Sequence, residues 1–160
     1  VIAGANGLQI LSIPIEGGRD HAHLYKAVLI ANTYHWQKKH WQSIRSCYGS
    51  APYFEHYACK ILPLFETRFE FLFEFNLAIL STLLASLKIN DTFSLTTIFE
   101  KHNTTQFDLR FVKGAEEKPV APSYYQVFEN KNGFMANLSI LDAVFNLGPS
   151  TKDYLLTIHS

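Results

Sequence analysis

The stretch of sequence that decides the fold is residues 35–48, which read His35-Trp36-Gln37-Lys38-Lys39-His40-Trp41-Gln42-Ser43-Ile44-Arg45-Ser46-Cys47-Tyr48. At about 100° per residue, Trp36, His40 and Cys47 fall in one narrow strip. Lys39 and Arg45 fall on the opposite arc. This separation predicts an amphipathic helix that packs its Trp36 strip against a core and turns its cations to water.

Three further helices are predicted on the C-terminal side of this stretch. One opens at Pro52, which a first helical turn tolerates, and is interrupted at Pro63. The most apolar segment, residues 72–87, predicts the central core helix. A short final helix follows Asn137 and ends near Gly148.

Strands are predicted on both sides of these helices. Leu8–Ile15 and Lys26–Ala31 are rich in apolar and β-branched residues, and residues 91–99 alternate weakly. Residues 113–122 have the composition of a loop. Because 160 residues are typical of one domain, we expect a single α/β or α+β domain over 1–160, with a small sheet packed against several helices.

Composition excludes several classes of protein. Hydrophobic residues make up 48% of the chain and charged residues 18%, which excludes an intrinsically disordered chain. A net charge of zero argues against a nucleic-acid partner. The longest uncharged apolar run, residues 75–87, is shorter than the roughly 20 residues that span a bilayer. With two cysteines and no visible signal peptide, we expect a cytoplasmic protein.

His40 and its neighbours are the first candidates for chemistry. A histidine on an inward strip can act as a general acid or base, or can be a core residue that donates to a backbone carbonyl. Lys39 and Arg45 can bind an anionic group, or can form an ordinary solvated face. The sequence leaves both pairs of interpretations open.

The polar residues around the final helix are the second candidates. Ser139, Asp142 and Asn146 share one arc, which is either a solvent face or one wall of a site. Asn137 or Ser139 can cap the helix, and Ser139 with Asp142 resembles a capping box. The pair His21 and His23, beside Asp20, has the spacing of a weak metal site, for which no third ligand of the right kind follows. The sequence identifies no cofactor.

Two motifs carry a family resemblance. The first runs from His35 to Phe54 and includes the run Trp36-Gln37-Lys38-Lys39-His40-Trp41, then Tyr48 and Ala51-Pro52-Tyr53-Phe54. The second comprises Tyr125-Gln126-Val127-Phe128, Gly133-Phe134 and Leu138-Ser139-Ile140-Leu141-Asp142, then Phe145-Asn146 and Gly148-Pro149. In this order the motifs resemble the WbqC-like family, bacterial proteins associated with O-antigen and other surface-polysaccharide loci. Members begin with a further segment, which we expect this chain to lack.

The resemblance implies a role in surface-polysaccharide biosynthesis, and from it we expect a transferase that acts on an activated or amino-substituted sugar. The expected ligand is a small molecule or a nucleotide sugar. The expected catalytic residues are His40 and Asp142, and the expected substrate-binding residues are Trp36, Lys39, Arg45, Gln126, Asn137 and Ser139. The alternative is a non-catalytic binding or scaffold protein of a glycan-assembly complex, whose aromatic surface would be an interface.

Overall fold

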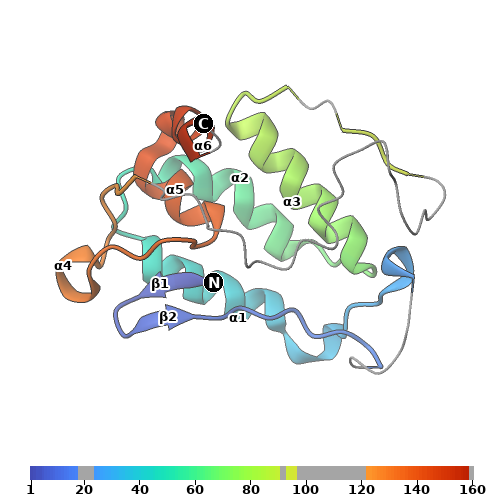
Figure 1. Ribbon diagram of the computed structural model, residues 1–160. Helices are drawn as coiled ribbons and strands as arrows, with labels where there is room; N and C mark the ends of the chain where they lie inside the picture. Colours follow the sequence, from blue (N-terminus) through green and yellow to red (C-terminus); the bar gives the residue numbers. More distant parts are fainter. Residues whose placement is uncertain (18–23, 91–92, 97–121, 159–160) are drawn as a thin grey trace, which may run out of the picture.

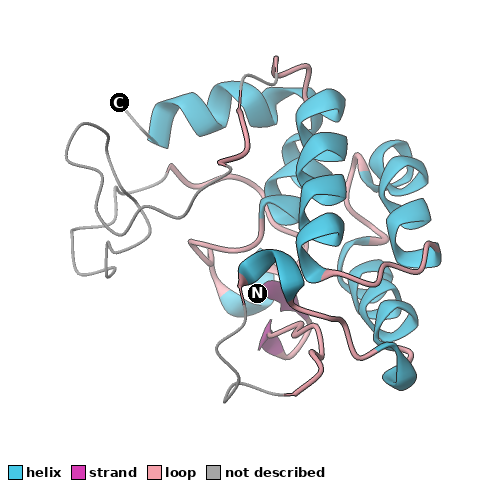
Figure 2. Ribbon diagram, turned by 90° about the vertical axis from the view of Figure 1, so that its right-hand side faces the viewer, coloured by secondary structure: helices cyan, strands magenta, loops and turns pink. Residues whose placement is uncertain are grey.

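The computed structural model of the protein describes residues 1–17, 24–90, 93–96 and 122–158. Within them, a two-stranded antiparallel sheet packs against five helices of eight residues or more, which confirms the expected single, small domain. The strands are β1 (Ile2–Gly4) and β2 (Gly7–Gln9), and the helices are α1 (Trp36–Tyr48), α2 (Phe54–Glu66), α3 (Leu72–Ser86), α5 (Ile140–Leu147) and α6 (Thr151–Ile158). Shorter turns are η2 (Tyr25–Ala27), η3 (Asn32–Tyr34), α4 (Glu129–Asn132) and η5 (Gly148–Ser150). Figure 2 shows how small the sheet is beside the helices.

Helix α2 is the central helix, and the expectation that residues 72–87 form the core centre is wrong. Helix α2 packs against α1, α3 and α5, and it lies between α1 and α3 (Figure 1). Helix α3 buries Phe75 and Leu83, whereas Leu80 is 42% exposed. The reason is the position of the two helices. Helix α2 has neighbours on several sides and therefore buries more of its surface than α3, which is more apolar but lies at the edge.

The second helix also ends later than predicted, because Pro63 lies inside α2 and does not interrupt it. Pro63 is exposed and sits in the last turn, where the missing N–H removes only one helical hydrogen bond. The Pro63 carbonyl accepts hydrogen bonds from the Thr67 N–H at 2.9 Å and from Thr67 Oγ1 at 2.8 Å. These two bonds end the helix one turn beyond the proline.

The predicted strands over 8–15 and 26–31 are for the most part replaced by isolated bridges. Ile15 pairs with Ile30, and Leu29 pairs with Phe71. The Pro14 carbonyl accepts from the Ala31 N–H at 2.9 Å, but a proline has no N–H with which to continue a ladder. Residues 93–96 form no strand, and the rest of 91–99 and most of the predicted loop at 113–122 lie outside the described residues.

The two edges of the sheet differ. Groups from distant parts of the chain close the outer edge of β1: the Ser139 N–H donates to the Val1 carbonyl at 2.8 Å, and Asn132 Nδ2 donates to the Gly4 carbonyl at 3.0 Å. The Ala3 N–H donates to the hydroxyl of Tyr48 at 3.3 Å. On the other strand, Leu8 is 64% exposed, and Ile10, which follows that strand, is 74% exposed.

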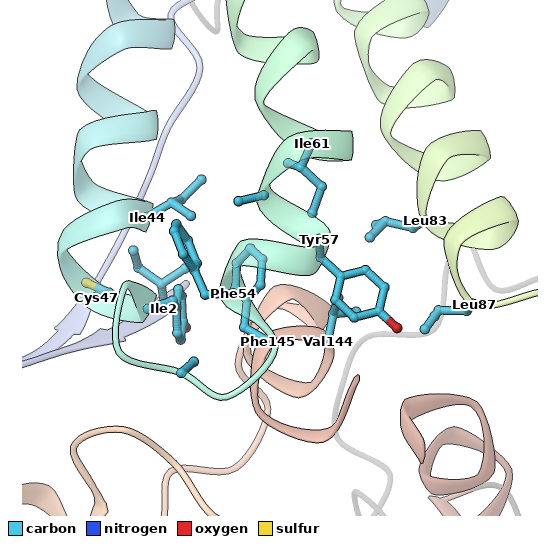
Figure 3. Close-up of a cluster of buried hydrophobic side chains, with 13 residues drawn as sticks. Ile2, Ile44, Cys47, Phe54, Tyr57, Ile61, Leu83, Leu87, Val144 and Phe145 are labelled. Carbon is cyan, nitrogen blue, oxygen red and sulfur yellow. The ribbon is translucent and has the colours of Figure 1, made fainter. Parts of the chain in front are cut away.

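The main core joins the ends of α1, α2 and α3 to α5. Val144 and Phe145 of α5 are fully buried, and Figure 3 shows them beneath Phe54 and Tyr57 of α2. The Phe145 ring centroid lies 5.3 Å from that of Tyr48 and 5.1 Å from that of Phe54. The face of α5 that carries Asp142 and Asn146 is therefore held in a fixed orientation by its neighbours 144 and 145.

Candidate functional site

A buried polar cluster lies where α5 meets the end of α1. Asp142 is 1% exposed, Asn146 is 6% exposed and Gln126 is 2% exposed. Asp142 and Asn146 are four residues apart on α5 and so share one helical face. The sequence left open whether the polar arc of this helix faces solvent or forms one wall of a site. The burial of Asp142 and Asn146 excludes a solvent face.

One oxygen of the Asp142 carboxyl collects several donors. The Tyr124 hydroxyl donates to Asp142 Oδ1 at 2.8 Å, and Gln126 Nε2 donates to the same atom at 3.1 Å. Gln126 is itself fixed, because its Nε2 donates to the Met135 carbonyl and its Oε1 accepts from the Met135 N–H, each at 2.9 Å. The loop over 124–135 thus positions two donors on the carboxyl.

The other oxygen of this carboxyl has no partner. Asp142 Oδ2 and Asn146 Oδ1 are both buried, and no group within the described residues forms a hydrogen bond of good geometry with either, although the Tyr48 hydroxyl lies close enough to the Asp142 carboxyl to lower its pKa. The Asn146 side-chain nitrogen donates to the Asp142 backbone carbonyl at 2.9 Å and lies 3.5 Å from Asp142 Oδ1. Because nearly all buried polar atoms in proteins have partners, two unpartnered acceptors one turn apart are unusual.

Burial sets the protonation of this cluster. Burial raises the pKa of Asp142, although hydrogen bonds from Tyr124 and from the other polar neighbours act in the opposite direction. Burial and the nearby Asp142 also raise the pKa of Tyr48 and that of Tyr124, so both hydroxyls keep their protons. Burial therefore favours the protonated form of the Asp142 carboxyl, which is the form that can donate a proton.

A second cluster surrounds His40 on α1. Trp36 is 3% exposed, its Nε1 donates to Asn32 Oδ1 at 3.4 Å, and its ring centroid lies 5.2 Å from that of His40. His40 is half-buried, and this burial lowers its pKa. The imidazole is therefore largely neutral at neutral pH. Lys39 and Arg45 are exposed on the far arc of α1, as the periodicity predicts.

The predicted site residues thus fall into separate groups. Gln126 and Asp142 are in contact, and Trp36 and His40 are in contact. Eight residues separate His40 from Tyr48, the α1 residue nearest Asp142, which is about 12 Å along a helix. The two expected catalytic residues therefore do not touch the same partners.

Ser139 and Asn137 have local structural roles. Ser139 is the N-cap of α5, where its Oγ accepts from the Leu141 N–H at 3.4 Å. Asn137 is exposed with a positive φ of 58° and lies outside the helix, so it is not the cap. The capping-box interpretation of Asp142 is also wrong, because that carboxyl turns inward to Tyr124.

Sequence reasoning did not assign Tyr48 or Tyr124 a role at a site, and it placed Asn146 on the polar arc of the final helix without a role of its own. Asn146 carried a signal, since it follows Asp142 by four residues on the same polar arc. Tyr48 appears in the first motif, but the spacing of neither Tyr48 nor Tyr124 relates it to α5, because only the tertiary fold brings them there. Among the described residues no three His, Cys, Asp or Glu side chains gather as a metal site, and Asp20, His21 and His23 lie outside them.

Comparison with known proteins gives one match. The model of the WbqC-like protein family matches residues 1–117. No curated protein and no solved structure matches the chain. The matched residues include the motif at 35–54, whereas the motif at 125–149 lies beyond them. In the part of the chain that the structure describes, no helix is long and apolar enough to cross a bilayer.

Proposed function

Because the chain belongs to the WbqC-like protein family, we propose that it is an enzyme of bacterial surface-polysaccharide (O-antigen) biosynthesis, a transferase that acts on an activated or amino-substituted sugar. One observation carries the proposal: the buried Asp142 carboxyl keeps an oxygen without a partner. A residue selected for stability alone would be replaced by an apolar one at this position, because an unpartnered buried acceptor costs free energy. Retained polar groups of this kind are typical of functional sites.

The proposed roles follow from the contacts. Asp142 exchanges a proton with the substrate, and Tyr124 and Gln126 hold its carboxyl in place. His40 is a second acid or base beside Trp36, since burial keeps its pKa low enough for a neutral imidazole. Lys39 and Arg45 bind the phosphates of an activated sugar, as exposed cations on one helix arc can.

Asn137 and Ser139 complete the proposed site at the start of α5. Ser139 orders the first turn of this helix, and the exposed Asn137 side chain lies beside it. In this proposal they contact the sugar and do not take part in proton transfer. The cytoplasm, where activated sugars are made, is the proposed location.

A ligand screen tests the proposal. The protein is heated with nucleotide sugars, amino sugars and acyl donors in turn. A ligand at about 100 times its Kd stabilises the fold by roughly 2.7 kcal/mol, which a thermal-shift assay detects. The shift should fall in Lys39→Ala and persist in the control Lys152→Ala, whose lysine is exposed on α6. Absence of any shift from a folded protein would contradict the proposal.

The second candidate function is a non-catalytic subunit of a glycan-assembly complex. The exposed side chains of Leu8 and Ile10 favour it, because neighbouring exposed apolar groups mark interaction surfaces. Replacing both by Thr separates the two functions. A subunit would lose its partner in co-purification, whereas an enzyme would keep its ligand-induced thermal shift.

A further inference from the structure

The two unpartnered acceptors on α5 define the group that they would bind. Asp142 Oδ2 and Asn146 Oδ1 are both hydrogen-bond acceptors, and the Asn146 nitrogen is already used by the Asp142 carbonyl. A matching group must therefore present at least two donors. A hydroxyl presents one, whereas a primary ammonium presents three and accepts nothing.

The charge of the site also indicates an ammonium group. Within the described residues, no Lys, Arg or His side chain forms an ion pair or hydrogen bond with the Asp142 carboxyl. A buried carboxylate without a cation is costly, and a positively charged ligand would compensate it. A bound water could donate hydrogen bonds to the unpartnered oxygens, but it would not compensate the negative charge of the Asp142 carboxylate.

Tyrosine rings complete the surroundings. Tyr48, Tyr124 and Tyr154 all interact electrostatically with Asp142, and the ring centroids of Tyr124 and Tyr154 lie 4.9 Å apart. Aromatic faces attract ammonium groups through their quadrupoles, by about 0.5–2 kcal/mol in most sites. A carboxylate among several tyrosines is a chemical environment suited to an ammonium ion.

We propose that Asp142 Oδ2 and Asn146 Oδ1, among the rings of Tyr48, Tyr124 and Tyr154, bind the protonated amino group of an amino sugar. This inference rests on the proposed function and identifies which feature of the sugar the site recognises. Asp142 is 1% exposed, so the proposal requires a neighbouring side chain to move when the ligand enters, and Tyr124 is the candidate. Tyr124 is half-buried and lies outside the helices.

The first test probes the ammonium site without a sugar. Thermal unfolding is measured in methylammonium, tetramethylammonium and sodium chlorides at equal concentration. Methylammonium alone should raise Tm, because tetramethylammonium has no N–H donors. The rise should vanish in Asp142→Asn and persist in Asp153→Asn, a matched change on exposed α6. Equal shifts from the three salts would overturn the inference, and this comparison needs no variant to fold.

The second test uses sugars. UDP-sugars with a free amine at one ring position are compared by calorimetry with their N-acetyl counterparts. The free amine should bind at least about tenfold more tightly, as expected for a hydrogen bond to a charged group. Tight binding without this preference overturns the inference and leaves the proposed function standing. A thermal shift in methylammonium without any binding of sugars would support the ammonium site and contradict the proposed function. Failure of both tests would contradict the ammonium site and the proposed function alike.

Discussion

Replacing Asp142 by Asn should make the ligand-free protein more stable. The new side-chain oxygen can keep the hydrogen bonds from Tyr124 and Gln126, while an amide nitrogen takes the place of the unpartnered Oδ2. The change removes a buried charge and supplies donors one helical turn from Asn146 Oδ1. One unsatisfied buried acceptor costs about 1–3 kcal/mol, so we expect a gain of that size. For a chain of this length each kcal/mol raises Tm by about 2–4 °C.

The gain should depend on pH with a definite sign. Burial raises the pKa of Asp142 above its ordinary value of 3.8. The wild type therefore has its full stability from this group below pH 3.8 and loses it as the pH rises through the higher pKa of the folded state. The advantage of Asp142→Asn should grow through the same window and be constant above it.

Urea unfolding at a series of pH values measures this difference. Asp153→Asn is the matched control, because it makes the same chemical change at an exposed position. A variant at Asp142 that is less stable than wild type throughout, or whose advantage shrinks as the pH rises, would refute the reasoning. Such a result would mean that an unseen donor satisfies Oδ2 in the wild type.

Three further predictions concern other positions. Burial lowers the pKa of His40, so its contribution to stability is present above pH 6.5 and is lost as the pH falls through the folded-state pKa; His40→Gln should flatten this loss in denaturation curves measured at decreasing pH below 6.5. Gly148→Ala should cost more than Gly133→Ala, because a Cβ at 148 would lie 2.5 Å from the Tyr53 ring and one at 133 meets nothing within 4 Å; equal Tm losses would contradict the clash. Ser139→Ala should cost about 1 kcal/mol in urea unfolding through loss of the α5 cap, and a neutral effect would mean that its 3.4 Å bond is not formed.

The sequence predicts the helices of this fold better than its strands. Residues 35–48 separate apolar and charged residues at helical spacing, and α1 buries Trp36 and Cys47 as that spacing predicts. A strand depends on a partner that is distant in sequence. Leu8–Ile15 has the composition of a strand, but outside Gly7–Gln9 it finds only the single bridge from Ile15 to Ile30.

The site is predictable only in part, for a related reason. Helical spacing places Asp142 and Asn146 on one polar arc, but it does not tell which segment covers that arc. The covering residues are Tyr124, which lies 18 positions upstream in an irregular loop, and Gln126, which the second motif did single out. Ser139 was predicted to act locally as a cap or at the site, and the cap is confirmed.

The closed edge of β1 also constrains the order in which the molecule can assemble. The Val1 carbonyl can accept its hydrogen bond only after Ser139 has been synthesised. The Gly4 carbonyl likewise depends on the side chain of Asn132, 128 positions away. On a ribosome that adds about 5–20 residues per second, the first strand therefore emerges many seconds before its partners. The long chain segments between β1 and these two residues must close into loops before the contacts can stabilise the fold, and this loop closure slows folding. The buried polar cluster on α5 and the closed edge of β1 should consequently form late and together, so that a chain stalled before residue 139 has neither.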